Sequence, residues 1–110
     1  MNYIKVASIN ELKPGKMIKI MLLDTPVLLA NLDGTFYAID DTCPHMGGSL
    51  SKGKLEGKNV VCPKHGSVFD IKTGKVIKRG NILLIPVKVH NLKSYPVKIE
   101  DQDVMLCIPD

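Results

Sequence analysis

Apolar residues occur along the chain in short runs that do not keep the spacing of a long amphipathic helix. The first runs are typical of β-strands and lie at residues 3–7, 17–23, 26–32 and 35–39. Asp33-Gly34 separates the last two of these runs and is a strong β-hairpin signal. Ser8 to Glu11 match a capping box, but Pro14-Gly15 follow at once, so we expect a single helical turn at most.

The same short spacing continues through the rest of the chain. Residues 54–62 predict a hairpin around Glu56-Gly57 whose second arm leads into Cys62. Further strands are expected at residues 68–71, 75–78, 96–100 and 104–108, the last two forming a final hairpin. Residues 79–81 indicate a break. Pro86 interrupts the apolar residues 82–89, which predicts an edge strand or an extended connector there.

Short strands at intervals of about 8–12 residues, without a helix-length period, predict an all-β protein. A chain of 110 residues suffices for one domain with a modest core. The pattern alone therefore predicts that residues 1–110 form a single small antiparallel β-sandwich or barrel.

Candidate chemistry is concentrated in two short segments, Cys43-Pro44-His45 and Cys62-Pro63-Lys64-His65. Two thiolates and two imidazoles make a four-ligand set that suits zinc or an iron–sulfur cluster. A zinc finger usually draws its cysteines and its histidines from separate elements, whereas here each segment offers one of each. This order suits a dinuclear centre in which one iron is held by both cysteines and the other by both histidines.

The motif C-P-H-M-G-G-S-L, followed by C-P-K-H-G-S-V-F-D, resembles the Rieske [2Fe–2S] family. The likeness is close over residues 40–76 and looser at 33–38 and 95–100. The resemblance implies a basal β-sandwich built from both ends of the chain, with a cluster-binding subdomain inserted at about 40–80. It also implies one [2Fe–2S] cluster per chain, with the cysteine-bound iron inside and the histidine-bound iron near the surface. The implied ligands are Cys43, His45, Cys62 and His65.

Other residues of the two segments are expected to shape the cluster environment. Glycine allows backbone amides to approach closely and tolerates positive φ, which suits Gly47, Gly48 and Gly66. Proline stiffens the loop after each ligand cysteine, at Pro44 and Pro63.

The resemblance assigns further roles in these segments. It implies that Met46 shields the cluster and that Ser67 donates a hydrogen bond to it. Relatives from cytochrome bc complexes carry a disulfide where this chain has Gly48 and Lys64, and a tyrosine where it has Phe69. We therefore expect a potential in the low or middle part of the family's range of about −150 to +300 mV.

Charge is unevenly distributed. The chain has 15 basic and 11 acidic residues, and residues 40–80 hold eight of the former and four of the latter, which leaves seven of each elsewhere. The basic residues of this segment are Lys52, Lys54, Lys58, Lys64, Lys72, Lys75, Lys78 and Arg79. The chain has no Trp and no pattern of a recognition helix, so nucleic acid is not expected. An acidic redox partner is the more economical interpretation, although scattered lysines are often only a solvated surface.

We therefore expect a soluble one-electron carrier, a Rieske-type ferredoxin that takes electrons from a reductase and feeds an oxygenase or another acceptor, and not an enzyme by itself. The alternatives are the small Rieske-like subunit of a nitrite reductase or another redox complex, and a structural zinc module. His90 is interpreted as a surface or structural histidine, and Cys107 as a small buried residue of the core. The start of the chain lacks the apolar segment of a signal peptide, no run is long enough to span a membrane, and the cysteines leave no pair for a structural disulfide. We therefore expect a cytoplasmic protein without a membrane partner.

Overall fold

Antiparallel sheets make up most of the computed structural model, which describes residues 2–44 and 47–108. The first sheet has the order β1-β13-β12, formed by Tyr3–Ser8, Asp103–Cys107 and Val97–Glu100. The second has the order β11-β4-β3-β2, formed by Ser94–Tyr95, Thr35–Asp40, Thr25–Leu32 and Lys16–Leu22. The third has the order β5-β6-β7-β8, formed by Lys54–Glu56, Asn59–Val61, Val68–Asp70 and Val76–Lys78. The strands β9 (Asn81–Ile82) and β10 (Ile85–Pro86) form a small separate hairpin.

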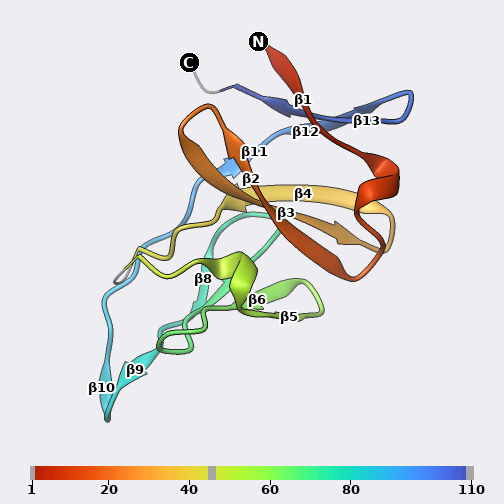
Figure 1. The fold of residues 1–110 in the computed structure, drawn as a ribbon. Helices are drawn as coiled ribbons and strands as arrows, with labels where there is room; N and C mark the ends of the chain where they lie inside the picture. The colour runs from red at the N-terminus through yellow and green to blue at the C-terminus, as the bar shows by residue number, and fades with distance from the viewer. Residues whose placement is uncertain (1, 45–46, 109–110) are drawn as a thin grey trace.

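The three larger sheets are stacked, with β2, β3 and β4 in the middle of the molecule (Figure 1). Side chains of β3 alternate between two cores: Val27 and Leu29 pack toward the β1-β13-β12 sheet, whereas Leu28 and Ala30 pack toward the β5–β8 sheet. All four are fully buried. A strand buried on both faces has no side that faces solvent, which explains why residues 26–30 are all apolar. The polar residue that follows, Asn31, is buried and donates to the carbonyl of Leu12 at 2.8 Å.

The local turn signals of the sequence are confirmed. Asp33 and Gly34 both have positive φ, 54° and 91°, as a two-residue hairpin turn between β3 and β4 requires. The capping box at Ser8 is formed, because the Ser8 N–H donates to Glu11 Oε1 at 2.9 Å and the Ser8 side chain accepts from the Asn10 N–H. It begins a single 3-10 turn, η1 (Ile9–Glu11). A second turn of this kind, η2 (Leu50–Lys52), was not predicted.

Residues 79–89 contain the edge strand expected around Pro86, but it belongs to a hairpin that was not predicted. Asn81 and Ile82 pair with Pro86 and Ile85 across a turn at Leu83–Leu84, so this stretch is a hairpin. Leu83 has a φ of 58°, which leucine rarely adopts, and the turn contains none of the residues that signal a hairpin. The remainder of the stretch does connect, leading to the short strand β11, which pairs with β4.

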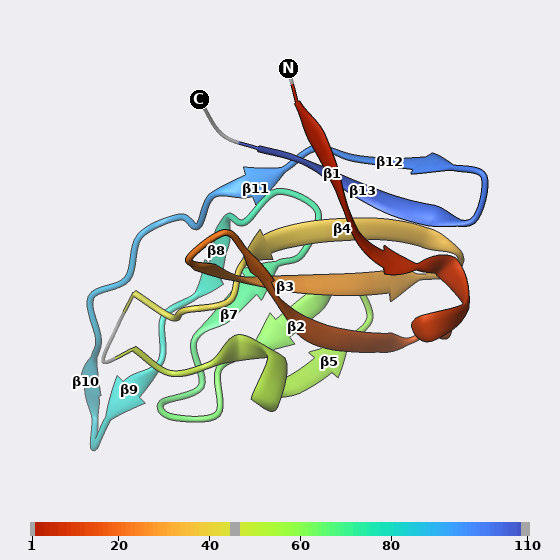
Figure 2. The ribbon, with the colours of Figure 1, turned by 45° about the horizontal axis from the view of Figure 1, so that its top comes forward.

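The molecule measures 48 × 29 × 17 Å along its principal axes. Figures 1 and 2 show the two segments that carry the candidate ligands at the same end as the β9–β10 hairpin, while β1 and β13 lie at the other side of the middle sheet. Neither short helical turn of the described residues could cross a membrane.

Candidate metal centre

The first candidate ligand loop leaves β4 after Asp40 and ends at η2. Within it the Cys43 N–H donates to the carbonyl of Gly48 at 2.7 Å, and Thr42 forms a bridge with Ser49. These bonds close the loop at its base. The Cys43 side chain consequently faces the inner core that contains Leu50 and Phe69, with only 2% of the residue exposed.

The second candidate ligand loop joins β6 to β7 and is closed in the same way. The Cys62 N–H donates to the carbonyl of Ser67 at 2.8 Å, which again lies five residues further along the chain. Cys62 is 3% exposed, whereas His65 is half-buried. Gly66 has a φ of 80° and allows the loop to turn back after His65. The two loops are therefore closed by the same kind of backbone hydrogen bond, although their ligand spacings differ.

Gly48 marks the point where the two loops meet. A Cβ added there would lie 3.2 Å from Cys62 Sγ and 3.1 Å from Lys64 Cγ. Gly48 does not have positive φ, so here glycine serves a close approach, whereas Gly47 has a φ of 67° with open space around it. The thiol of Cys62 thus lies directly against the loop that carries Cys43.

A third segment supports the second ligand loop, and the sequence identified it only as a break. The Gly80 N–H donates to Ser67 Oγ at 3.0 Å, and the Asn81 N–H donates to the carbonyl of His65 at 3.0 Å. A Cβ on Gly80 would stand 2.0 Å from that same carbonyl oxygen. Ser67 is 1% exposed and accepts from Gly80, which leaves its hydroxyl hydrogen to donate to another acceptor.

Asp41 is a further residue of the site that spacing arguments missed. Its carboxylate is buried and accepts from the Ser49 hydroxyl at 2.5 Å and from the Ser51 N–H at 2.7 Å. The Leu50 N–H donates to its carbonyl at 2.8 Å. One side chain thus holds the two ends of the first loop together. An acidic residue two positions before a ligand cysteine carries no recognisable signal of this role.

Asp40 connects the start of the same loop to β11. Tyr95 Oη donates to Asp40 Oδ1 at 2.6 Å, and the Asp40 N–H donates to the carbonyl of Lys93 at 2.9 Å. Burial, followed by the hydrogen bond and the charge of Asp40, raises the pKa of Tyr95 far above its ordinary value. The phenol therefore remains neutral and donates to the carboxylate over the ordinary pH range.

The basic residues of segment 40–80 are all exposed, but their surroundings differ. Lys54 and Lys58 approach Glu56 at 3.5 Å and Asp70 at 4.0 Å, and Lys72 lies over the ring of Tyr37. Lys64 lies within the second ligand loop, and Lys78 and Arg79 precede the segment that supports it. Lys64, Lys78 and Arg79 are therefore the cations closest along the chain to the end of the molecule that carries the candidate ligands, which we call the ligand end.

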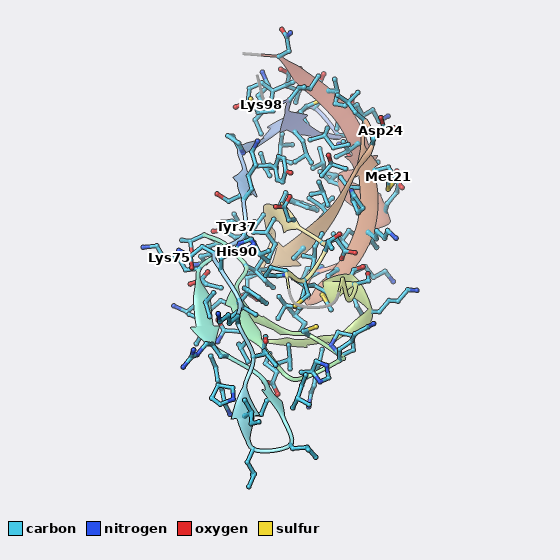
Figure 3. The ribbon with its side chains drawn as sticks, turned by 90° about the vertical axis from the view of Figure 1, so that its left-hand side faces the viewer. Met21, Asp24, Tyr37, Lys75, His90 and Lys98 are labelled. Atoms are coloured by element: carbon cyan, nitrogen blue, oxygen red, sulfur yellow. The ribbon has the colours of Figure 1, made fainter. Side chains whose placement is uncertain are left out.

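Two expected site residues, His45 and Met46, lie outside the described residues. Phe69 is fully buried in β7, Pro44 is half-buried, and Pro63 is exposed. His90 lies on the connector between β10 and β11, well above the β9–β10 hairpin at the bottom of Figure 3, with its Nδ1 2.9 Å from the carbonyl oxygen of Asn91. Cys107 is buried in β13 beside Tyr3, in a different sheet from the ligand loops.

The donor set fits a dinuclear centre. Among residues 2–44 and 47–108, no three His, Cys, Asp or Glu side chains converge as ligands of a single ion would. A [2Fe–2S] cluster needs no such convergence, because the cysteines and the histidines hold different irons. Two buried cysteines on adjoining loops, with a half-buried histidine further out, match this division.

Comparisons with known proteins agree with this donor set. The family model described as "Rieske [2Fe-2S] domain" matches residues 2–96. A curated relative is the ferredoxin component of the naphthalene 1,2-dioxygenase/salicylate 5-hydroxylase systems from Ralstonia sp. It is 34% identical over 105 residues, which are 96% of this chain and 94% of the relative.

Solved structures show the same architecture. The terminal oxygenase of carbazole 1,9a-dioxygenase from Novosphingobium sp. KA1 matches with a TM-score of 0.86 and 32% identity, over 99% of this chain and 30% of the oxygenase chain. A chain in the complex of reduced oxygenase and oxidized ferredoxin of carbazole 1,9a-dioxygenase matches with a TM-score of 0.77 and 28% identity. That match covers 94% of this chain and 91% of the other.

Proposed function

Because the chain belongs to the Rieske [2Fe–2S] family, we propose that it is the ferredoxin of an oxygenase system, which accepts one electron from a reductase and passes it to the oxygenase. The observation that carries this proposal is the ligand end itself, where two buried cysteines lie behind a half-buried histidine. A carrier needs a cofactor close to the surface, and it needs no substrate pocket beside it.

The proposed ligands are Cys43 and Cys62 for the inner iron, and His45 and His65 for the outer iron. When bound, a [2Fe–2S] cluster takes up one electron and releases it again. The hydrogen bond at the base of each loop fixes the shape of that loop, and the close approach at Gly48 brings the two loops together. The inner core excludes water from the cysteines. Ser67 offers a hydrogen bond from a buried position, and His65 provides the described route to the surface. The segment 40–80 would thus act as the cluster-binding insert of a single domain.

The matched relatives favour a carrier over the small subunit of a nitrite reductase, because their descriptions name ferredoxin components of dioxygenase systems. We further propose that the oxygenase presents an acidic docking surface to Lys64, Lys78 and Arg79, which are exposed at the ligand end. Opposite charges speed encounter more than they strengthen the final complex. Two of the three cysteines are proposed ligands, so no pair is left for a structural disulfide, which supports a reducing, cytoplasmic setting.

Stopped-flow spectroscopy tests the proposal. The dithionite-reduced protein is mixed with a panel of oxidised terminal oxygenases that includes those of the naphthalene 1,2-dioxygenase and carbazole 1,9a-dioxygenase systems. We expect at least one oxygenase to reoxidise the protein rapidly, at a rate that falls as salt is raised, since the Debye length is only about 10 Å at 0.1 M. If no oxygenase of the panel reoxidises the protein, the proposed function is wrong.

Lys64→Glu tests the acidic partner. This variant should slow electron transfer at low salt and converge with the wild-type protein at high salt, after correction for any change in potential. Lys19→Glu makes the same charge change at an exposed position of β2, outside the ligand end, and is the control. Equal rates for the two variants would mean that the lysines at the ligand end are only a solvated surface.

A further inference from the structure

The tip of the β9–β10 hairpin is the most exposed apolar feature of the described chain. Leu83 is 89% exposed, Leu84 is 96% exposed and Ile85 is 69% exposed, while Ile82 is partly covered. Contiguous apolar side chains in water, particularly beside polar ones, mark sites of interaction. The hairpin that carries them extends from the rest of the molecule (Figures 1 and 2).

The turn itself is built from unsuitable residues. Leu83 has a φ of 58°, a conformation that favours glycine or asparagine, and both turn residues are leucines. Gly or Asn at position 83 would relieve the backbone and reduce the exposed apolar area at the same time. Leucines at the tip worsen both folding and solubility, so their benefit has to come from outside the monomer.

The hairpin is tied directly to the candidate ligand His65. Its first residue, Asn81, donates its N–H to the His65 carbonyl, and the preceding Gly80 donates to Ser67 Oγ. Val87, which follows β10, is buried and donates its N–H to the carbonyl of Gly80 at 2.8 Å. The base of the hairpin is therefore fixed relative to the second ligand loop, and a molecule bound at the tip is held in a set position relative to that loop.

The surroundings of the tip define the chemistry of its partner. Residues 71–99 contain no acidic residue, and the tip is flanked by Lys78, Arg79 and Lys88, all exposed. A complementary surface therefore combines an apolar recess with a rim of carboxylates. An anionic membrane would offer a similar combination, but the attachment of the hairpin to His65 favours the protein that exchanges an electron there.

We propose that Leu83 and Leu84 insert into an apolar recess, rimmed by carboxylates, on the oxygenase component that receives the electron. This inference rests on the proposed function and adds the contact that holds the complex together. The leucines set the lifetime of the complex, because burying apolar area slows dissociation, whereas the lysines set the rate of encounter.

The test replaces the tip without disturbing the fold. Leu83→Asn suits the positive φ, and Leu84→Ser removes the second apolar side chain, so the double variant should unfold at a temperature no lower than wild type. Its visible spectrum and reduction potential should also equal those of wild type. With the oxygenase that reoxidises the wild-type protein, we expect Kd to rise at least about tenfold, since burying one leucine side chain is sufficient for that change. The rise should persist at high salt, and the limiting electron-transfer rate should be unchanged.

The chain offers a closely matched control in the turn between β2 and β3. Leu23 also has positive φ, 56°, and both Leu23 and Met21 are exposed, at 68% and 55%. Figure 3 shows Met21 and Asp24, which mark this turn, far from the hairpin at the bottom of the view. The double variant Leu23→Asn/Met21→Ser should leave Kd unchanged.

The outcomes separate the two proposals. If wild type reduces none of the oxygenases, the proposed function fails and this inference fails with it. If wild type reduces one and the tip variant binds that oxygenase as tightly as wild type, only this inference is overturned. Sedimentation and binding to vesicles of phosphatidylcholine and phosphatidylserine are measured in parallel. Loss of self-association or vesicle binding in the tip variant, with an unchanged oxygenase Kd, assigns the tip to a second copy or to a membrane and likewise overturns the inference.

Discussion

Gly80 allows the support of the second ligand loop to be tested with a single added methyl group. In Gly80→Ala the new Cβ would stand 2.0 Å from the carbonyl oxygen of His65, 2.6 Å from its carbonyl carbon and 2.8 Å from the Ser67 nitrogen. Ordinary contact begins at 3.4 Å, so the segments must separate by about 1.4 Å at the closest point. All three atoms belong to backbone, which cannot move aside as the end of a flexible side chain can.

The cost follows from two effects. Forcing a methyl group into a filled site costs about 1–3 kcal/mol. Separation also weakens the bonds from Gly80 to Ser67 Oγ and from Asn81 to the His65 carbonyl, worth roughly 0.5–1.5 kcal/mol each. We expect a total loss of about 3 kcal/mol in the free energy of unfolding. For a chain of this length, the midpoint should fall by roughly 12 °C.

Thermal melts of the cluster-loaded protein, followed by circular dichroism and by visible absorbance, measure this loss. Gly57→Ala is the matched control, because Gly57 lies in the β5–β6 turn with positive φ, 59°, and nothing within 4 Å of an added Cβ. It should cost only the strain of the turn, about 1 kcal/mol. The absorbance of Gly80→Ala should disappear before its β-structure, since the ligand loop moves first. A Gly80→Ala protein as stable as Gly57→Ala, with an unchanged spectrum, would refute the supporting role of this segment.

Two further changes probe the surroundings of the ligand loops. Ser67→Ala removes a buried hydrogen-bond donor and should lower the reduction potential. The shift should be less than about 130 mV, because a hydrogen bond to a charged acceptor is worth at most about 3 kcal/mol. Voltammetry showing a higher potential, or a shift equal to that of the remote Ser94→Ala, would contradict this. Tyr95 has a raised pKa, so its stabilising effect is complete below its unfolded-state pKa of about 10 and is lost as pH rises above it. Urea denaturation should therefore show that Tyr95→Phe is about 1 kcal/mol less stable than wild type at neutral pH. Above about pH 10 the free energy of unfolding should fall less in the variant than in wild type. Identical pH profiles would contradict the burial of the phenol.

The sequence predicted the features of the fold that depend on neighbouring residues. Asp33-Gly34 specified its turn because few residues accept positive φ. The apolar residues 26–30 indicated a strand because a strand buried on both faces is largely apolar. The strand β11 was missed because two residues show no period. Pairings such as Tyr3 with Cys107 are also invisible in local patterns, since they join distant segments. The β9–β10 hairpin was missed because Leu83 and Leu84 lack turn chemistry.

In the candidate site, too, local sequence patterns predicted some residues and missed those whose role depends on distant contacts. Cysteines and histidines are rare enough that their spacing pointed to the four expected ligands, three of which lie in described residues. The supporting groups are common residues whose role depends on contacts across the fold. Asp41 holds a loop whose far end is ten residues away at Ser51, and Gly80 contacts a carbonyl fifteen residues earlier. Neither contact can be inferred from residue type.

The pairing of β1 with β13 brings the two ends of the described chain together. The Ile108 N–H donates to the carbonyl of Asn2 at 2.7 Å, and Figure 1 shows this junction across the middle sheet from the ligand end. A polypeptide can therefore enter and leave the unit on one side while the opposite side stays accessible. Such a unit can be spliced into a larger protein as a cassette, as the match to less than a third of an oxygenase chain illustrates. By the same geometry, a fluorescent reporter or a surface tether attached at either end would leave electron exchange at the ligand end unobstructed.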